Sequence, residues 1–358
     1  MILTKEKAII NNANVQQSVY RHNELFALES GKIIPAFHLQ YTTYGKLNAA
    51  KDNVVWVFHA LTANSEAADW WPGLIGKGKL FDTEKYFVVC ANIPGSAYGS
   101  ISPLDINPVT GEKYYHDFPL FTIRDIVHTF QQLKNYLGIE KIAVGIGGSL
   151  GGMQLLEWAI EVPDVFDKII SIGTSAKTSP WAIALNASQR MAIEADSTWK
   201  NKSDDAGLNG LKAARSIALL SYRDYNTYEL TQQGVTEASA SLPIDEQIYR
   251  AETYQRYQGE KMVKRFNAFS YYFITKTLDS HDVGRNRGSI EKALNRIRAK
   301  ALVMGISTDI LFPPAEQETI ARNIPNAELH IIDSLFGHDG FLLEFEKIEK
   351  FIIPFLNK

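Results

Sequence analysis

The stretch Ile142-Ala-Val-Gly-Ile146 runs directly into Gly147-Gly-Ser149-Leu-Gly151, and these ten residues decide the fold. The first five are apolar or small and show no polar alternation, which is typical of a strand covered on both faces. The next five fit the pattern Gly-x-Ser-x-Gly. A helical pattern follows over 153–161 and ends before Pro163. A buried strand, a glycine-rich turn and a helix in this order predict a strained turn that exposes the serine hydroxyl.

Other functions of glycine-rich loops fit these residues less well. A phosphate-binding P-loop needs Gly-Lys-Ser/Thr, and this stretch has no lysine. A dinucleotide-binding Gly-x-Gly-x-x-Gly beginning at Gly145 would need its third glycine at Leu150. A glycine-rich turn without chemistry remains the alternative. We therefore expect Ser149 to be a nucleophile and the amide of Leu150, at a helix N-terminus, to stabilise an oxyanion.

Five further β-branched runs resemble the strand before the serine. They cover 54–58, 86–90, 169–172, 301–304 and 329–332. Helical patterns such as Thr122 to Leu137 lie between them, so we predict an α/β fold with a mainly parallel sheet and helices on both faces. We expect the extended segment 32–45 to form early strands at one edge.

The alternation of strands and helices stops over residues 176–297. This interval contains helical patterns but no strand run like those above. We interpret residues 1–175 and 298–358 as one core domain, and 176–297 as a helical lid inserted into it.

The acid and base of a serine nucleophile should follow it in the order Asp or Glu, then His. Asp309 lies in the loop after the strand at 301–304, and it could instead be a turn or capping aspartate. Asp333 is the weaker rival. His338 lies between glycines in 336–340, before a final helical pattern over 341–353, and a solvated loop histidine is its alternative. We predict that His338 takes the serine proton and that Asp309 orients its ring.

A second oxyanion donor is expected in the loop after an early strand. The strand at 54–58 leads directly into this loop, and the backbone N–H of Leu61 is the candidate donor. We expect His59 to brace the loop rather than to perform chemistry. No spacing of the HExxH type occurs, so we expect no metal site.

Composition excludes several classes of protein. The 358 residues carry a net charge of −3, which argues against nucleic-acid binding through a basic surface. No apolar run is long enough to span a membrane, and the first eight residues lack the apolar region of an export signal. The single cysteine, Cys90, excludes an internal disulfide and is expected in the core. We expect a cytoplasmic protein.

Several longer motifs together resemble the homoserine O-acetyltransferase family. They are Phe58-His-Ala-Leu-Thr62, Trp70-Trp-Pro-Gly-Leu-Ile-Gly76, Tyr98-Gly-Ser-Ile-Ser-Pro103, Ile106-Asn-Pro108, Asp117-Phe-Pro119 and Gly147 to Trp158. The resemblance implies the α/β-hydrolase fold with a helical lid, and acetyl transfer from acetyl-CoA to L-homoserine in methionine biosynthesis. It also implies small-molecule substrates, no permanently bound cofactor, and a homodimer joined through the lid.

The resemblance implies the same triad and adds three positions. Arg215 matches the arginine that binds the substrate carboxylate, Tyr222 matches a site tyrosine, and Asp339 matches the aspartate that contacts the substrate amine. Arg215 lies within an apolar helical stripe, where a guanidinium requires an anionic partner, either the substrate or a buried carboxylate of this chain. Asp339 could instead cap the final helix.

The implied mechanism is a ping-pong acyl transfer through an acetyl-Ser149 enzyme. The stretch 310–314 after the acid resembles the acetyl rather than the succinyl branch of the family. The stretches 94–97 and 266–270 depart from the family's usual residues near the acceptor pocket or lid. Three alternatives therefore stay open: a serine O-acetyltransferase, a succinyl-transferring relative, and a plain serine esterase.

Overall fold

The fold is built on an eight-stranded sheet. The computed structural model describes residues 15–358, and the first eight residues, on which the expectation about export rests, lie outside them. The strand order is β1-β4-β6-β5-β7-β8-β9-β10. The bounds are β1 Val15–His22, β4 Phe37–Tyr44, β5 Val54–Phe58, β6 Phe87–Ala91, β7 Ile142–Gly148, β8 Phe166–Ile172, β9 Lys300–Ile306 and β10 Ala327–Ile332. In this order, the neighbouring strands from β6 to β10 pair in parallel. Strand β4 pairs antiparallel with both of its neighbours, β1 and β6. The predicted mainly parallel α/β architecture is confirmed.

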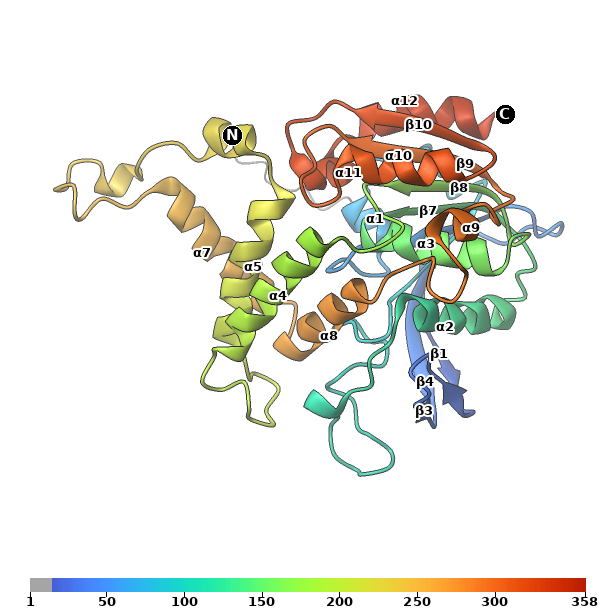
Figure 1. Cartoon of the computed structure of the whole chain (residues 1–358), viewed down its shortest axis with the longest axis horizontal. Helices are drawn as coiled ribbons and strands as arrows, with labels where there is room; N and C mark the ends of the chain where they lie inside the picture. Colours follow the sequence, from blue (N-terminus) through green and yellow to red (C-terminus); the bar gives the residue numbers. More distant parts are fainter. Residues whose placement is uncertain (1–14) are drawn as a thin grey trace.

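Alternate residues of the central strands face two separate cores. In β5, Trp56 and Phe58 pack into one core and Val55 and Val57 into the other. Helices α2 (Ile123–Tyr136), α3 (Leu150–Glu161) and α10 (Pro314–Asn323) contribute to the first core, and α1 (Ala67–Trp70) and α12 (Phe345–Leu356) to the second. Helices therefore cover both faces of the sheet (Figure 1), which explains why the strand sequences lack polar alternation.

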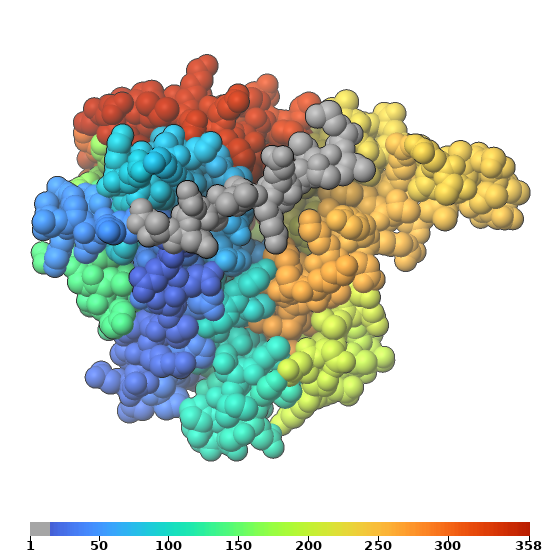
Figure 2. All heavy atoms as spheres, turned by 180° about the vertical axis from the view of Figure 1, so that it is seen from behind, coloured from blue at the N-terminus to red at the C-terminus, as the bar shows by residue number. Residues whose placement is uncertain are grey.

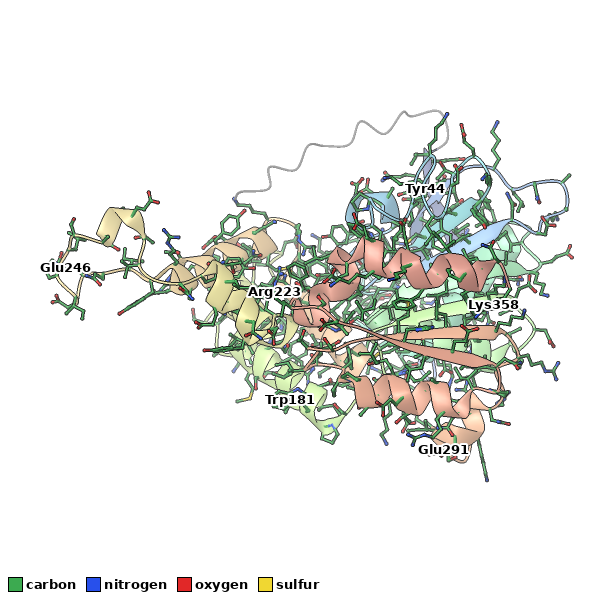
Figure 3. All side chains as sticks on the ribbon, turned by 90° about the horizontal axis from the view of Figure 1, so that it is seen from above. Tyr44, Trp181, Arg223, Glu246, Glu291 and Lys358 are labelled. Atoms are coloured by element: carbon green, nitrogen blue, oxygen red, sulfur yellow. The ribbon has the colours of Figure 1, made fainter. Side chains whose placement is uncertain are left out.

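The interval 176–297 contains helices joined by loops and, apart from isolated bridges, no strand. Its helices are α4 Pro180–Glu194, α5 Leu208–Tyr222, α6 Tyr225–Thr231, α7 Arg250–Val263, α8 Ala268–Asp279 and α9 Ile290–Leu294. Figure 1 shows α4, α5, α7 and α8 grouped to one side of the sheet. The segment between α6 and α7 projects from the body, with Glu246 near its tip (Figures 2 and 3). By contrast, α9 neighbours α3 and α10 beside the sheet.

Several boundaries differ from the sequence prediction. Helix α3 begins at Leu150 rather than at 153, because the chain becomes helical directly after the serine. The final helical pattern is broken at Glu344 into α11 (Gly340–Leu343) and α12. Segment 32–45 contains β4 and the short β3 (Ile33–Ile34), which pairs with β2 (Phe26–Ala27), but the edge strand is β1. No helix among residues 15–358 is long and apolar enough to span a membrane.

Candidate active site

Ser149 occupies a strained turn between β7 and α3. Its backbone angles are φ 56° and ψ −128°, a conformation that costs a residue with a side chain about 1 to 3 kcal/mol. The serine N–H donates to the Ile172 carbonyl at 2.9 Å, and Thr174 Oγ1 donates to the serine carbonyl at 2.8 Å. A Cβ on Gly151 would lie 2.1 Å from the Phe58 carbonyl oxygen. The glycine therefore lets α3 approach β5 closely, and the tight turn forms as predicted.

The structure brings Ser149, His338 and Asp309 into one hydrogen-bonded chain. His338 Nε2 lies 2.9 Å from Ser149 Oγ, and His338 Nδ1 lies 2.7 Å from Asp309 Oδ2. All three residues are buried. The other Asp309 oxygen accepts the N–H groups of Leu311 and Phe312 at 2.8 and 2.9 Å, which fixes the carboxylate. This geometry assigns the ring proton to Nδ1 and leaves Nε2 to accept the serine proton.

Asp309 also controls the charge of the histidine. Burial by itself lowers the pKa of His338, but the charge and hydrogen bond of Asp309, with a smaller contribution from the charge of Asp339, raise it above its usual value. The imidazolium that would form during proton transfer is therefore stabilised. The rival acid, Asp333, is exposed and hydrogen-bonds Ser307, so it is not the partner of this histidine.

The loop containing His338 is placed by a glycine. Gly337 has φ 60°, and a Cβ there would lie 2.8 Å from the backbone nitrogen of Asp224. The loop therefore passes directly against the chain that leaves α5. As a result the ring of His338 lies next to the ring of Tyr222, with 5.8 Å between the two centroids.

One predicted oxyanion donor directly follows the serine in sequence, and the other lines the same cavity as the serine. Leu61 follows β5, and Leu150 is the first residue of α3. Neither backbone N–H donates a hydrogen bond to another of residues 15–358. Free amides beside a nucleophile are the groups that stabilise an oxyanion.

His59 holds the first of these loops. Its Nε2 accepts from the Ile93 N–H at 3.0 Å, so its Nδ1 carries the proton and donates to the Ala60 carbonyl at 2.8 Å. Burial lowers the pKa of His59 to about 4 and keeps the ring neutral. These bonds agree with the bracing role expected from the sequence.

Most of the predicted site residues line one cavity of about 410 Å³. Its lining includes Ser149, His338, Leu61, Arg215, Tyr222 and Asp339. Asp309 and Leu150 lie behind this lining, which is the place expected for an orienting carboxylate and a helix N-terminus. The cavity has the size of a small-molecule site.

Arg215 has no carboxylate partner within 4 Å among the described residues. Its guanidinium carbon lies 5.5 Å from the ring centroid of Tyr222. Burial raises the pKa of Tyr222, so this hydroxyl stays protonated and can donate. The buried carboxylate of this chain that was the alternative partner for the arginine is therefore not found there.

Asp339 pairs with a second arginine. Its Oδ2 lies 3.1 Å from Arg223 Nε, and both side chains are mostly buried. Figure 3 shows Arg223 where the inserted helices meet the salmon-coloured C-terminal region, far from the last residue, Lys358. Asp339 precedes α11, but its side chain makes no capping hydrogen bond. The capping alternative is therefore not seen.

The cavity has further lining residues that the sequence interpretation did not assign. They include Asp69 and Trp70 from α1, Tyr98 from a core loop, Lys261 from the end of α7 and Arg265 just after it. Trp70 and Tyr98 belong to motifs quoted above and could have been proposed from them. Lys261 and Arg265 are exposed residues in a polar helical stretch, and nothing in their spacing distinguishes them from a solvated surface. Residues 15–358 contain no group of three or more His, Cys, Asp or Glu placed to hold a metal ion.

Known proteins resemble this chain over most of its length. Residues 53–345 match the family model of the α/β hydrolase fold. The chain is 46% identical over 339 residues to a homoserine O-acetyltransferase of Cyclobacterium marinum, covering 95% of each protein. It resembles the crystal structure of homoserine O-acetyltransferase from Bacillus anthracis, with a TM-score of 0.87, 26% identity and coverage of 96% and 98%. It also resembles the crystal structure of esterase E22, with a TM-score of 0.87, 26% identity and coverage of 96% and 100%.

Proposed function

The chain belongs to the homoserine O-acetyltransferase family of the α/β hydrolase fold, and we propose that it moves an acetyl group from acetyl-CoA to the hydroxyl of L-homoserine. The reaction proceeds in two halves through an acetyl-Ser149 intermediate, and its product enters methionine biosynthesis. Acetyl-CoA acts as a substrate, and no cofactor stays bound between turnovers.

In the first half, Ser149 attacks the thioester. His338 Nε2, 2.9 Å from the serine oxygen, accepts its proton while Oγ bonds to the acetyl carbon. The N–H groups of Leu61 and Leu150 stabilise the oxyanion. When the carbon–sulfur bond breaks, the imidazolium returns the proton to the leaving CoA sulfur.

In the second half, the acceptor hydroxyl takes the place of the CoA sulfur. Arg215 binds the homoserine carboxylate, Asp339 binds its ammonium group, and Tyr222 lies between the arginine and the histidine. His338 removes the hydroxyl proton, the oxygen attacks the acetyl carbon, and the proton passes to Ser149 as the ester is released. The inserted helices help to keep water away from the intermediate.

One observation carries the acceptor assignment. Arg215 enters the cavity that holds Ser149, and no carboxylate of the described chain lies within 4 Å of it. A partly buried guanidinium without an internal partner favours an anionic ligand. Its paired N–H groups match the two oxygens of a carboxylate. The carboxylate Asp339 faces the same cavity. Opposite charges in one small cavity favour a free amino acid as acceptor.

A panel of donors and acceptors tests the proposal. Acetyl-CoA and succinyl-CoA are each supplied with L-homoserine, L-serine or water, and kcat/KM is measured for every combination. We expect acetyl-CoA with L-homoserine to give the highest value. A higher value with L-serine or with succinyl-CoA would identify another transferase. Mass spectrometry after acetyl-CoA treatment should show an acetyl adduct on the wild type and none on Ser149→Ala.

Hydrolysis is the second candidate, favoured by the similarity to esterase E22. An esterase would release CoA from acetyl-CoA, or cleave simple esters, at a rate indifferent to added homoserine. A transferase should partition its acetyl-enzyme toward homoserine at millimolar acceptor. The ratio of acetylated acceptor to free acetate separates the two.

We also propose a cytoplasmic homodimer joined through the inserted helices. The family resemblance supports this, together with exposed apolar side chains in this region. They include Tyr225 (72% exposed), Leu230 (71%) and Ile244 (80%). Size-exclusion chromatography with light scattering measures the mass directly, and a monomer at micromolar concentration would contradict this assembly.

A further inference from the structure

We propose that Arg265 is a positioning residue, which holds the oxyanion loop from the side of the inserted helices. The oxyanion loop here means residues 59–63, which carry the Leu61 amide. Arg265 Nη1 donates to the Thr62 carbonyl at 2.5 Å, and Nη2 reaches Thr62 Oγ1 at 3.4 Å. This inference rests on the proposed function, because it assigns the Leu61 amide to the oxyanion of Ser149 chemistry.

The core fixes only the first part of this loop. His59 is held by its own two ring bonds, and its carbonyl accepts from Gln154 Nε2 at 3.3 Å. Gln154 Nε2 also donates to the Leu150 carbonyl at 3.1 Å, so it links the loop to the start of α3. The turn then closes through the Ala63 N–H to the Ala60 carbonyl at 3.1 Å.

The far side of the turn depends on Arg265. Within residues 15–358, the hydrogen bonds that Thr62 makes with residues outside the turn all involve this guanidinium. The Thr62 carbonyl that Arg265 holds shares its peptide unit with the Ala63 N–H, which donates to the Ala60 carbonyl. The Ala60 carbonyl in turn shares its peptide unit with the Leu61 N–H, so a tilt of the Thr62–Ala63 peptide changes the direction of the Leu61 N–H. The arginine therefore restrains the one side of the oxyanion loop that the core leaves unsupported.

Arg265 is itself well anchored despite its exposure. It follows α7, and its backbone N–H and that of Phe266 both donate to the Met262 carbonyl at 3.1 Å. The buried side chains of Met262 and Phe266 hold the backbone on either side of it. The guanidinium also donates to Tyr98 Oη at 2.7 Å, and the Tyr98 ring packs edge-on against Phe266 with 5.7 Å between centroids.

These contacts give the inserted helices a direct role in chemistry. A displacement of about 1 Å of a catalytic group can lower a rate on the order of 100-fold. Loss of a whole oxyanion donor costs about 100- to 1,000-fold. Loosening a donor without removing it should cost less, so we expect removal of the arginine to slow acylation of Ser149 by about 10- to 100-fold.

The test measures Ser149 acylation with p-nitrophenyl acetate, an uncharged donor. The rate constant of the p-nitrophenol burst is compared for the wild type, Arg265→Ala, Arg265→Lys and Lys264→Ala. Lys264→Ala is the matched control, because it removes an exposed cation from the adjacent position. Thermal melts of each variant confirm that the exposed substitution leaves the fold intact. The burst does not involve the acceptor, so an enzyme that used another hydroxyl would leave this test unaffected.

We expect the burst of Arg265→Ala to slow by the stated factor, with partial recovery in Arg265→Lys and no change in Lys264→Ala. Lysine restores one donor to the Thr62 carbonyl but cannot reach Tyr98 with the same fork. An unchanged burst in Arg265→Ala, with only a raised KM for acetyl-CoA, would overturn the proposal, because it would assign the arginine to recognition of an anionic donor. Equal slowing in Lys264→Ala would also overturn it.

Discussion

At the scale of single residues, the site combines groups whose properties depend on their neighbours. His338 is buried, which disfavours its charged form, yet Asp309 is so close that the charged form is favoured overall. Ser149 is exposed to the cavity only because its backbone accepts a strained conformation between β7 and α3. Neither property can be attributed to the serine or the histidine in isolation.

The raised pKa of His338 predicts the pH dependence of acylation. Nε2 must be unprotonated to accept the serine proton, so kcat/KM should fall as the pH falls through this pKa. Because the pKa of His338 in the folded protein lies above the usual 6.5, the fall of kcat/KM on the acid side of the pH profile (the acid limb) should be centred above pH 6.5. Asp339→Asn removes one of the charges that raise this pKa, so the limb should move to lower pH. Burst rates with p-nitrophenyl acetate across pH measure this, and a limb that moved upward would contradict it.

Arg215 gives a prediction that separates acceptor binding from chemistry. Arg215→Ala removes the charge-assisted bidentate contact that we propose for the homoserine carboxylate, and hydrogen bonds to charged groups contribute about 1.5 to 3 kcal/mol each. We expect KM for L-homoserine to rise about 10- to 100-fold. The p-nitrophenyl acetate burst should stay within about twofold of the wild type, since the arginine does not touch the triad. Equal losses in both assays would indicate a structural role instead.

At the scale of elements, most strands were predictable because they are short, apolar and buried on both faces. The strands at β5, β6, β7, β8, β9 and β10 were all anticipated, with ends shifted by up to three residues. Edge strand β1 (Val15–His22) was not, because half of its side chains face solvent and it carries Gln, Ser, Arg and His. The break at Glu344 was also missed, since apolar residues continue on both sides of it.

The elbow between β7 and α3 depends on close backbone contact, which Gly151→Ala tests. The added Cβ would meet the Phe58 carbonyl oxygen at 2.1 Å, and a backbone atom cannot move aside as a flexible side chain could. We expect a loss of about 3 kcal/mol or more in the free energy of unfolding. Gly234→Ala is the control, with φ 74° and no atom within 4 Å of its Cβ. It should cost only about 1 kcal/mol. Urea denaturation measures both, and equal costs would contradict the argument from contact.

At the scale of the whole molecule, a largely buried ion network joins segments that are distant in sequence. Glu157 of α3 lies 2.8 Å from Arg124 Nε of α2 and also pairs with Arg287, which follows α8. Glu29 pairs with Arg124 and Arg285, each at 2.7 Å. The network therefore ties the chain returning from the inserted helices to the core. It was not predicted, because each member alone looks like an ordinary surface charge in the sequence.

This network also bears on the division of the chain. Residues 282–297 were assigned to the inserted lid, but Arg285 and Arg287 pair with core residues and α9 lies beside α3. The helices from α4 to α8 form the group that stands to one side of the sheet (Figure 1). In the proposed mechanism, acylation and acceptor binding need residues from both groups, since Ser149 and Arg215 line the same cavity. The ion pairs that connect the core to the chain returning from the inserted helices should therefore matter for stability as well as for activity.

Glu157→Gln tests the contribution of this ion network to stability. The glutamate side chain is 3% exposed, and removing its charge leaves Arg124 and Arg287 without their shared partner. Breaking a buried pair in this way costs about 3 to 5 kcal/mol of folding free energy. Asp164→Asn is the matched control, because it breaks the exposed pair of Asp164 with Arg298. Such a surface pair contributes about 0 to 1 kcal/mol. Urea denaturation at neutral pH should show a large loss for Glu157→Gln and almost none for Asp164→Asn.

The pH dependence of this difference identifies its electrostatic origin. Burial by itself raises the pKa of Glu157, but the hydrogen bonds and charges of Arg287 and Arg124 lower it below its usual 4.5. The stabilisation is therefore fully present above pH 4.5, and it is lost as the pH falls through the lower folded pKa. The difference in unfolding free energy between the wild type and Glu157→Gln should be constant at neutral pH and shrink in acid. A difference that stayed the same in acid would assign the loss to packing rather than to charge.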